Sequence, residues 1–506
     1  MRTKLAAGDV EGAVRDTEDG KVLALLGVPY GAPEGDGLRF RRAHLHEGWA
    51  GTRSAMSPGA VSPQDPARVG SARVSEVGAL NLNVWRPVGA SGPLPVLVWI
   101  HGGAHMYGSN AHPLCDGGRL AAAHDMIVVA PNYRLGALGH LRLDHLLGDD
   151  FADAGNLALH DVMLALSWIH ANATALGADD QRVTIMGQSS GGAVVDALLS
   201  TETAGSLFRG VIAQSSLAER VHLPQEAADA TAQLLDELRL NDRDAGALLA
   251  LPAEEIIAAQ VAITHRRRTE RRLPWILFQP MVDGRLLPSI PLRAIAEGAG
   301  SEVDLLAGTN LNEGSGEVDL RSTDEHLAGR ELERLLQERY PGTEAGTYKA
   351  AMGGAASDVV ALESLYSDLL YRQPTNRLLS ARRAASGAGR TYSYLFRWSR
   401  PDTDAWARRA GHSLELPFIF RHVDDSEAAA AEVGSNPPLT LMHSMSKAWA
   451  GFVHEGRPTL PRGRPWPEYG EARRTAVLDE EIVTTEDPLA GLRILAEEHE
   501  LAPVAT

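Results

Sequence analysis

Short apolar runs and longer segments with helical spacing alternate through the first part of the chain. Residues 80–86, 94–100 and 125–134 are apolar and bounded by Gly, Pro or polar residues, which predicts buried strands. Residues 156–176 carry apolar side chains at helical spacing, and residues 181–186 form another strand-like run. This alternation predicts an α/β protein with a central, mostly parallel mixed sheet flanked by helices.

The pattern changes after residue 220. Ala-, Glu- and Leu-rich helical spacing covers about 223–262 and 324–387. Strand-like runs return at 275–284, at the start of 303–316, and at 390–399. Helical segments inserted between strands of a core sheet predict a cap over the ligand-binding edge. With 506 residues the length alone suggests about three domains. However, no stretch is polar and long enough to be a linker, so we expect residues 1–506 to form a single domain.

Charge and cysteine usage narrow the class of protein. The formal net charge is −17, which argues against nucleic acid or an anionic membrane as a partner. A basic run at 265–272 is better explained as a solvated loop or helix face than as a binding patch. Cys115 is the single cysteine, so no intrachain disulfide forms, and the N-terminal residues lack the apolar core of a signal peptide. We expect a cytoplasmic monomer or homodimer without a membrane span.

Candidate chemistry begins at residues 183–195, "VTIMGQSSGGAVV". A strand-like run reaches Gly187, two serines follow, and Gly191 precedes a small apolar helical segment. A chain of this composition holds about a third of one G-x-S-x-G match by chance, so the motif alone is weak. Its strand–turn–helix context predicts a nucleophile elbow with Ser189 as the protruding hydroxyl. The alternative is a loop serine with no chemical role.

A second loop supports the elbow. The strand at 94–100 runs into His101-Gly102-Gly103-Ala104, a pattern that offers backbone N–H groups to a developing oxyanion. His101 and His105 are four residues apart, as metal ligands on a helix can be, but the glycines between them favour a loop. We therefore expect no metal and no cofactor.

Several long motifs in one order resemble the type-B carboxylesterases, the α/β-hydrolase family of bacterial para-nitrobenzyl esterases, animal carboxylesterases and cholinesterases. They are "LALLGVPYGAP…LRFRRA", "LNLNVWRP", "NLALHDVMLALSWIHANATALGADDQRVTIMGQSSGG", "GTNLNEG", "GHSLELPFIF" and "AWAGFVHEGRP". The resemblance extends nearly end to end. It implies an α/β-hydrolase fold with helical cap or regulatory insertions.

The resemblance also assigns residues. It implies a catalytic triad of nucleophile Ser189, acid Glu313 and general base His412, in the family's chain order. The oxyanion-hole positions correspond to Gly103, Ala104 and Ser190. Supporting positions around the histidine correspond to Gln188, Ser215 and Glu415. Glu313 as a turn cap and His412 as a surface histidine are the structural alternatives.

The chain departs from the family pattern near the nucleophile. Gln188 replaces the usual glutamate before it, and Ser190 replaces the usual alanine after it. Ala104 stands at the third glycine of the oxyanion loop. His105 replaces a common aromatic residue. The sequence leaves two alternatives for its side chain, which either faces the pocket or has a structural role. These changes bear on substrate preference and pH behaviour rather than on the class of reaction.

The expected function is serine-dependent hydrolysis of small to medium uncharged carboxylic esters through an acyl-enzyme intermediate, with a small-molecule ester as the substrate. Carbamate or amide hydrolysis and acyl transfer use the same machinery and stay open. A catalytically silent binding protein is the alternative from another class. Such family members typically lack a triad residue, whereas this chain has all three.

Overall fold

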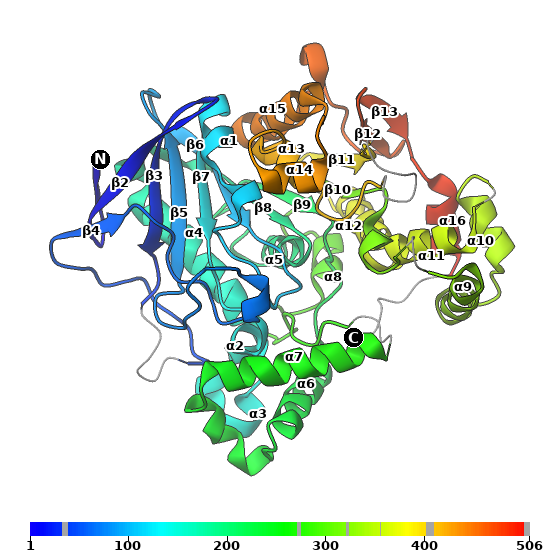
Figure 1. The fold of residues 1–506 in the computed structure, drawn as a ribbon, viewed down its shortest axis with the longest axis horizontal. Helices are drawn as coiled ribbons and strands as arrows, with labels where there is room; N and C mark the ends of the chain where they lie inside the picture. Colours follow the sequence, from blue (N-terminus) through cyan, green and yellow to red (C-terminus); the bar gives the residue numbers. More distant parts are fainter. Residues whose placement is uncertain (33–38, 271–274, 320–322, 355, 401–408, 500–506) are drawn as a thin grey trace.

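The computed structural model describes the chain except for residues 33–38, 271–274, 320–322, 355, 401–408 and 500–506. Its described strands form one mixed sheet in the order β1-β2-β3-β5-β7-β6-β8-β9-β10-β11-β12-β13, with β4 paired to β2 (Figure 1). All neighbours from β7 to β12 are parallel, and antiparallel pairs lie at both ends. The predicted mostly parallel mixed sheet is confirmed.

The strands are β1 (Arg2–Leu5), β2 (Gly8–Thr17), β3 (Gly20–Pro29), β4 (Thr52–Ala55), β5 (Asn81–Pro87), β6 (Leu94–Ile100), β7 (Ile127–Pro131), β8 (Ala178–Gln188), β9 (Gly210–Gln214), β10 (Asp304–Asn310), β11 (Thr391–Phe396), β12 (Arg474–Leu478) and β13 (Val483–Glu486).

Strand β6 shows why the central strands read as continuous apolar runs. Val96, Val98 and Ile100 belong to the core on one face of the sheet, and Leu97 and Trp99 belong to the core on the other. Because side chains alternate between the faces, a strand covered on both sides needs apolar residues at every position. The two faces are covered by different helices: α4 (Leu157–Leu176) and α5 (Ser190–Leu199) on the first, and α1 (Gly118–His124), α13 (Leu416–Phe420) and α15 (Leu439–Glu455) on the second.

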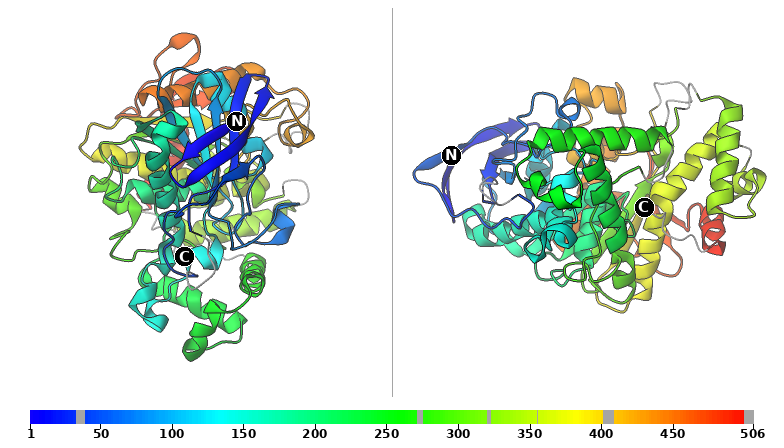
Figure 2. Two further views of the ribbon diagram at one scale, coloured as in Figure 1. Left: turned by 90° about the vertical axis from the view of Figure 1, so that its left-hand side faces the viewer. Right: turned by 90° about the horizontal axis from the view of Figure 1, so that it is seen from below.

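The remaining helices form two groups beside this layered core (Figures 1 and 2). One lies below the sheet in Figure 1: α2 (Gly136–His140), α3 (Asp144–Leu147), α6 (Pro224–Glu237), η5 (Asp242–Leu249) and α7 (Ala253–Thr269). The other lies to the right: α9 (Glu325–Arg339), α10 (Ala345–Ala351), α11 (Asp358–Ser367), η7 (Asp368–Arg372), α12 (Gln373–Ala384) and α16 (Ala490–Glu498). Also present are α8 (Pro291–Ala296), α14 (Glu427–Val433) and the short turns η1 (Pro66–Arg68), η2 (Pro113–Cys115), η3 (Asp149–Phe151), η4 (Ala154–Asn156), η6 (Glu313–Gly316) and η8 (Pro461–Gly463).

One predicted strand is wrong. Residues 275–284 form no strand of the sheet and pair only through an isolated bridge between Met281 and His222. The physical reason is that Leu277 and Phe278 pack against α6 and α7. The basic run at 265–272 continues α7 as far as Thr269, and its residues 271 and 272 lie outside the described part. None of the described helices combines the length and the apolar character needed to cross a bilayer.

The candidate site residues follow the carboxyl ends of the parallel strands. Strands β6, β8, β9 and β10 end directly before the segments that carry Gly103, Ser189, Ser215 and Glu313. The chain order also changes direction here, since β7 lies on one side of β6 and β8 lies on the other. In open α/β sheets such a switch point leaves a crevice beyond the strand ends where ligands bind.

Candidate active site

Ser189 occupies a strained turn between β8 and α5. Its backbone has φ 58° and ψ −126°, and its N–H donates to the Gln214 carbonyl over 2.9 Å. A Cβ atom on Gly187 would lie 2.1 Å from the Gly191 carbonyl oxygen, and one on Gly191 would lie 2.2 Å from the Ile100 carbonyl oxygen. The two glycines are therefore required for the close approach of the chain. The turn presents the Ser189 side chain to the cavity, as a nucleophile elbow does.

His412 and Glu313 form a short hydrogen-bonded pair beside this turn. His412 Nδ1 lies 2.6 Å from Glu313 Oε2. The other Glu313 oxygen accepts from Ser215 Oγ at 2.5 Å and from the Asn310 N–H at 2.7 Å. Burial alone would lower the pKa of His412, but the adjacent Glu313 carboxylate outweighs it and raises the pKa above its ordinary value. Glu313 thus fixes the tautomer in which Nδ1 carries the hydrogen and Nε2 is the basic nitrogen.

Glu415 lies behind this pair and is fully buried. It accepts from Asn310 Nδ2 at 2.6 Å and from Gln214 Nε2 at 2.9 Å. Burial, reinforced by the charge of Glu313, raises the pKa of Glu415 to about 7. At neutral pH this carboxyl is therefore neutral in a large fraction of molecules, which limits the negative charge behind His412.

The glycine-rich loop after β6 faces the same space. Gly103 and Ala104 have φ of 125° and 54°, a left-handed backbone that strains the alanine. Within the described residues, no hydrogen bond uses the N–H of Gly103 or Ala104 as donor. The Ser190 N–H belongs to the first turn of α5, where backbone donors have no partner within the helix. Three backbone donors are thus left for an anionic oxygen.

The two histidines of this loop, His101 and His105, are buried and pack against other aromatic rings. The His101 ring stacks on Tyr133, with centroids 4.5 Å apart, and burial lowers the pKa of His101 to about 4. His105, for which a pocket-facing position was open, is instead buried edge-to-face against His140, with centroids 5.0 Å apart. Burial lowers the pKa of His105 to about 3, so both rings are neutral. The described residues contain no cluster of three or more side chains suited to a metal ion.

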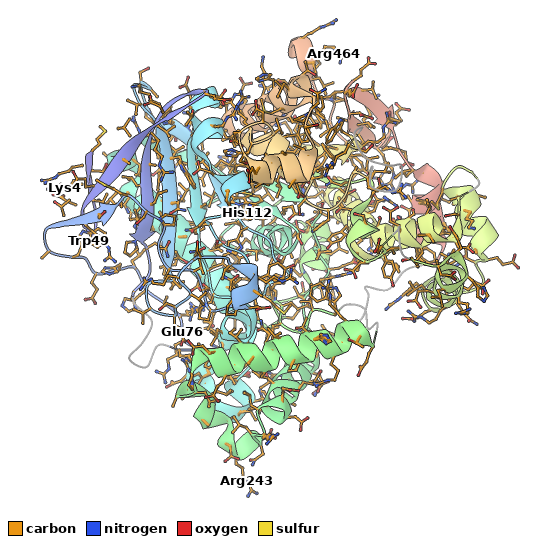
Figure 3. The ribbon with its side chains drawn as sticks, viewed as in Figure 1. Lys4, Trp49, Glu76, His112, Arg243 and Arg464 are labelled. Atoms are coloured by element: carbon orange, nitrogen blue, oxygen red, sulfur yellow. The ribbon has the colours of Figure 1, made fainter. Side chains whose placement is uncertain are left out.

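These groups open into one cavity of about 750 Å³. Its wall includes Ser189, Glu313, His412, Gly103, Ala104, Ser190 and Gln188. His112, near the middle of the view in Figure 3, is also part of the wall. Sequence patterns gave no signal for several other wall residues, which come from distant segments: Arg68, Tyr107, Trp275 and Tyr371. Arg268, from the basic run that we expected to be a solvated face, also lies in the wall. Arg268 lies over the Trp275 ring at 3.9 Å, which packs the end of α7 against the cavity.

Gln188 contacts His412 directly. Its amide Nε2 lies 3.1 Å from His412 Nε2, and with Nδ1–H committed to Glu313 this amide donates to the basic nitrogen. No hydrogen bond joins Ser189 and His412 in the described site.

We expect Gln188→Glu to move the acid limb of the pH profile of kcat/KM upward by about one pH unit. A carboxylate beside Nε2 stabilises the imidazolium and raises the pKa of His412. Because the base acts in its neutral form, activity is then lost at a higher pH as the pH falls. The profile is measured with p-nitrophenyl acetate. Gln188→Met, which removes the amide without adding charge, is the control. Its acid limb is expected at a lower pH than the acid limb of the glutamate variant. An unmoved limb in Gln188→Glu contradicts the contact.

Comparisons with known proteins agree with the fold and its motifs. The model of the carboxylesterase family matches residues 1–488. The chain is 33% identical to the para-nitrobenzyl esterase of Bacillus subtilis (strain 168), covering 94% of this chain and 95% of that protein. It is 30% identical to the phenmedipham hydrolase of Pseudarthrobacter oxydans, with 92% of each chain covered.

Solved structures give the same result. A PNB esterase structure superposes with a TM-score of 0.81 at 31% identity, over 98% of this chain and 99% of that chain. A carboxylesterase of Geobacillus stearothermophilus gives a TM-score of 0.83 at 30% identity, with the same coverage. The chain belongs to the carboxylesterase family and is an α/β-hydrolase enzyme that cleaves carboxylic esters.

Proposed function

We propose that this enzyme hydrolyses small to medium uncharged esters through an acyl-enzyme on Ser189. His412 Nε2 takes the Ser189 proton as Oγ bonds to the ester carbonyl carbon, and then gives the proton to the leaving alcohol. Glu313 holds His412 in the required tautomer through the 2.6 Å contact and stabilises its positive charge. Water, activated by the same nitrogen, then releases the acid. The observation that carries the proposal is the convergence of Ser189, His412 and Glu313 on one cavity.

The oxyanion hole in this proposal consists of the N–H groups of Gly103, Ala104 and Ser190. Their geometry supports it, because the three residues line the cavity and no hydrogen bond from their N–H groups is found within the described residues. Ser215 supports Glu313 by donating a hydrogen bond to its carboxylate. Glu415 supports it indirectly, because Asn310 donates hydrogen bonds to both Glu313 and Glu415. The proposed steps use no metal or cofactor.

The substrate class follows from the cavity. A volume of about 750 Å³ lies within the range typical of small-molecule sites, and much of the wall is apolar, including Trp99, Leu114, Leu217, Ile276 and Leu416. Such a wall favours uncharged acyl and alcohol groups. With a single cysteine the chain suits the reducing cytoplasm, where we propose that it acts as a monomer or homodimer on small-molecule esters.

A covalent label tests this proposal. A fluorophosphonate is expected to add once per chain, with ester hydrolysis lost in proportion to the adduct, and peptide mass mapping is expected to place the adduct on Ser189. Ser190→Ala retains labelling, because only the backbone N–H of that residue is used. Ser189→Ala takes no label and loses hydrolysis of p-nitrophenyl acetate. An adduct elsewhere, or an active Ser189→Ala enzyme, contradicts the assignment.

A further inference from the structure

The oxyanion loop, residues 101–108, is held at Gly108 by one buried amide. Gln64 is 1% exposed, and its Oε1 accepts from the Gly108 N–H at 2.8 Å. Its Nε2 donates to the Gly108 carbonyl at 2.9 Å and to the Ser62 carbonyl at 3.0 Å. The orientation of the amide is therefore fixed, because the reverse orientation would place its oxygen against two carbonyl oxygens and its NH₂ group against an N–H.

Gly108 in turn lies against the peptide group of a proposed oxyanion donor. It has φ 107°, and an added Cβ would lie 2.3 Å from the Gly102 carbonyl oxygen. The Gly102 carbonyl and the Gly103 N–H belong to one planar peptide group and point to opposite sides of it. The loop is also closed on itself, since the Gly103 carbonyl accepts from the N–H groups of Met106 and Tyr107 at 2.9 and 3.0 Å. A displacement of Gly108 therefore moves the Gly103 N–H.

The segment that carries Gln64 is itself anchored to the same loop. Ser62 Oγ donates to the Tyr133 carbonyl at 2.6 Å, and the Tyr133 hydroxyl donates to the His101 carbonyl at 2.6 Å. The Arg68 guanidinium lies over the Tyr107 ring, 5.1 Å from its centroid. The amide of Gln64 is thus presented to Gly108 from a support that is fixed at the start of the loop as well.

We propose that Gln64 is a positioning residue for the oxyanion hole. By holding both the N–H and the carbonyl of Gly108, it keeps the Gly103 N–H directed at the oxygen on which negative charge develops. Gln64 is not part of the cavity wall, so it acts only through the loop. The inference rests on the proposed role of the Gly103 and Ala104 N–H groups. Donors that are already in place stabilise the transition state without rearrangement during the reaction, which is the benefit that the amide supplies.

Gln64→Met tests the proposal, because methionine has a similar length but makes neither hydrogen bond to Gly108. We expect kcat/KM for p-nitrophenyl acetate to fall about tenfold, less than the loss for removal of a whole donor, since the N–H groups remain but are held less firmly. An aryl trifluoromethyl ketone adds to Ser189 and places an oxyanion in the hole. Its inhibition constant is expected to rise by the same factor. The inhibition constant of the corresponding secondary alcohol, which forms no adduct, is expected to stay unchanged.

Gln64→Glu provides a rescue within one variant. The ionised carboxylate cannot donate to the Gly108 carbonyl, whereas the neutral carboxyl group has one O–H donor and restores that contact. We therefore expect kcat/KM relative to wild type to recover as the pH falls. A ratio that is low and independent of pH contradicts the contact.

Gln373→Met is the matched control. This glutamine of α12 is buried, donates to the Leu492 carbonyl at 3.4 Å and lies outside the cavity wall, so we expect a lower melting temperature and an unchanged kcat/KM. A Gln64→Met enzyme with kcat/KM within twofold of wild type overturns the proposal. So does a loss of activity that matches a smaller fraction of fluorophosphonate-reactive enzyme, with an unchanged inhibition constant for the ketone. Failure of the oxyanion hole itself shows differently, as full activity in Gly103→Ala.

Discussion

Glu313→Gln is expected to lower kcat for p-nitrophenyl acetate by about 10⁴-fold, the scale of loss when an amide replaces the acid of a Ser-His-acid triad. In the structure Glu313 accepts from three donors: His412 Nδ1, Ser215 Oγ and the Asn310 N–H. An amide has one acceptor oxygen and a donor NH₂ group. Whichever way it turns, the NH₂ group faces a donor.

The more damaging orientation places NH₂ against His412. Nδ1 must then accept, the ring hydrogen moves to Nε2, and the nitrogen facing the cavity can no longer take a proton from Ser189. Steady-state kinetics measure the loss of catalysis, and thermal unfolding separately measures any loss of stability from the mismatched hydrogen bonds. Glu363→Gln is a matched control: this buried carboxylate contacts Asn312, the neighbour of Glu313, without touching His412. A Glu313→Gln enzyme within tenfold of wild type would show that Glu313 is not the acid.

Gly103→Ala is expected to reduce kcat by about 10²- to 10³-fold, the loss typical for removal of one oxyanion donor. Gly103 has φ 125°, and an added Cβ would lie 1.9 Å from the Tyr107 carbonyl oxygen. Because that atom is backbone, the loop must shift, and the N–H groups of Gly103 and Ala104 move with it. Kinetics with p-nitrophenyl acetate measure the loss.

The matched control for backbone strain is Gly205→Ala. Gly205 has φ 82°, with nothing within 4 Å of an added Cβ, so the substitution strains the chain without moving the oxyanion loop. We expect unchanged kinetics and a slightly lower melting temperature for this variant. If Gly103→Ala retains full activity, the loop after β6 does not bind the oxyanion.

The sheet and its local motifs could be predicted from the sequence because both depend on neighbouring residues. The apolar run at 94–100 and the helical spacing at 156–176 match β6 and α4 closely. The glycines around Ser189 lie within a few residues of it, so strand, turn and helix could be read together. The segment 275–284 shows the limit of this approach, since its apolar residues Leu277 and Phe278 pack against α6 and α7 although the segment forms no strand of the sheet.

The site beyond these motifs could not be derived from local pattern. Glu313 and His412 are 99 residues apart, and only the family resemblance paired them. Tyr371 lies in a segment with helical, apolar spacing that is indistinguishable from a core helix in the sequence. The contact between Gln188 and His412 depends on side-chain orientation across 224 residues. Each of these requires the tertiary fold.

The π-helical turn at 368–372 makes chain length matter as much as residue identity. A π turn contains more residues than an α turn, so the residues within it lie in a wider loop of the helix than α-helical residues would. Deleting one residue from it would restore α-helical spacing and remove the widening of the turn, which places the Tyr371 ring against His412 with centroids 4.5 Å apart. Tyr371 would then leave His412 although no residue of the site had been replaced. Among homologous sequences, a gap of one residue here is therefore expected to mark enzymes that lack this tyrosine contact, whatever the aligned letters show.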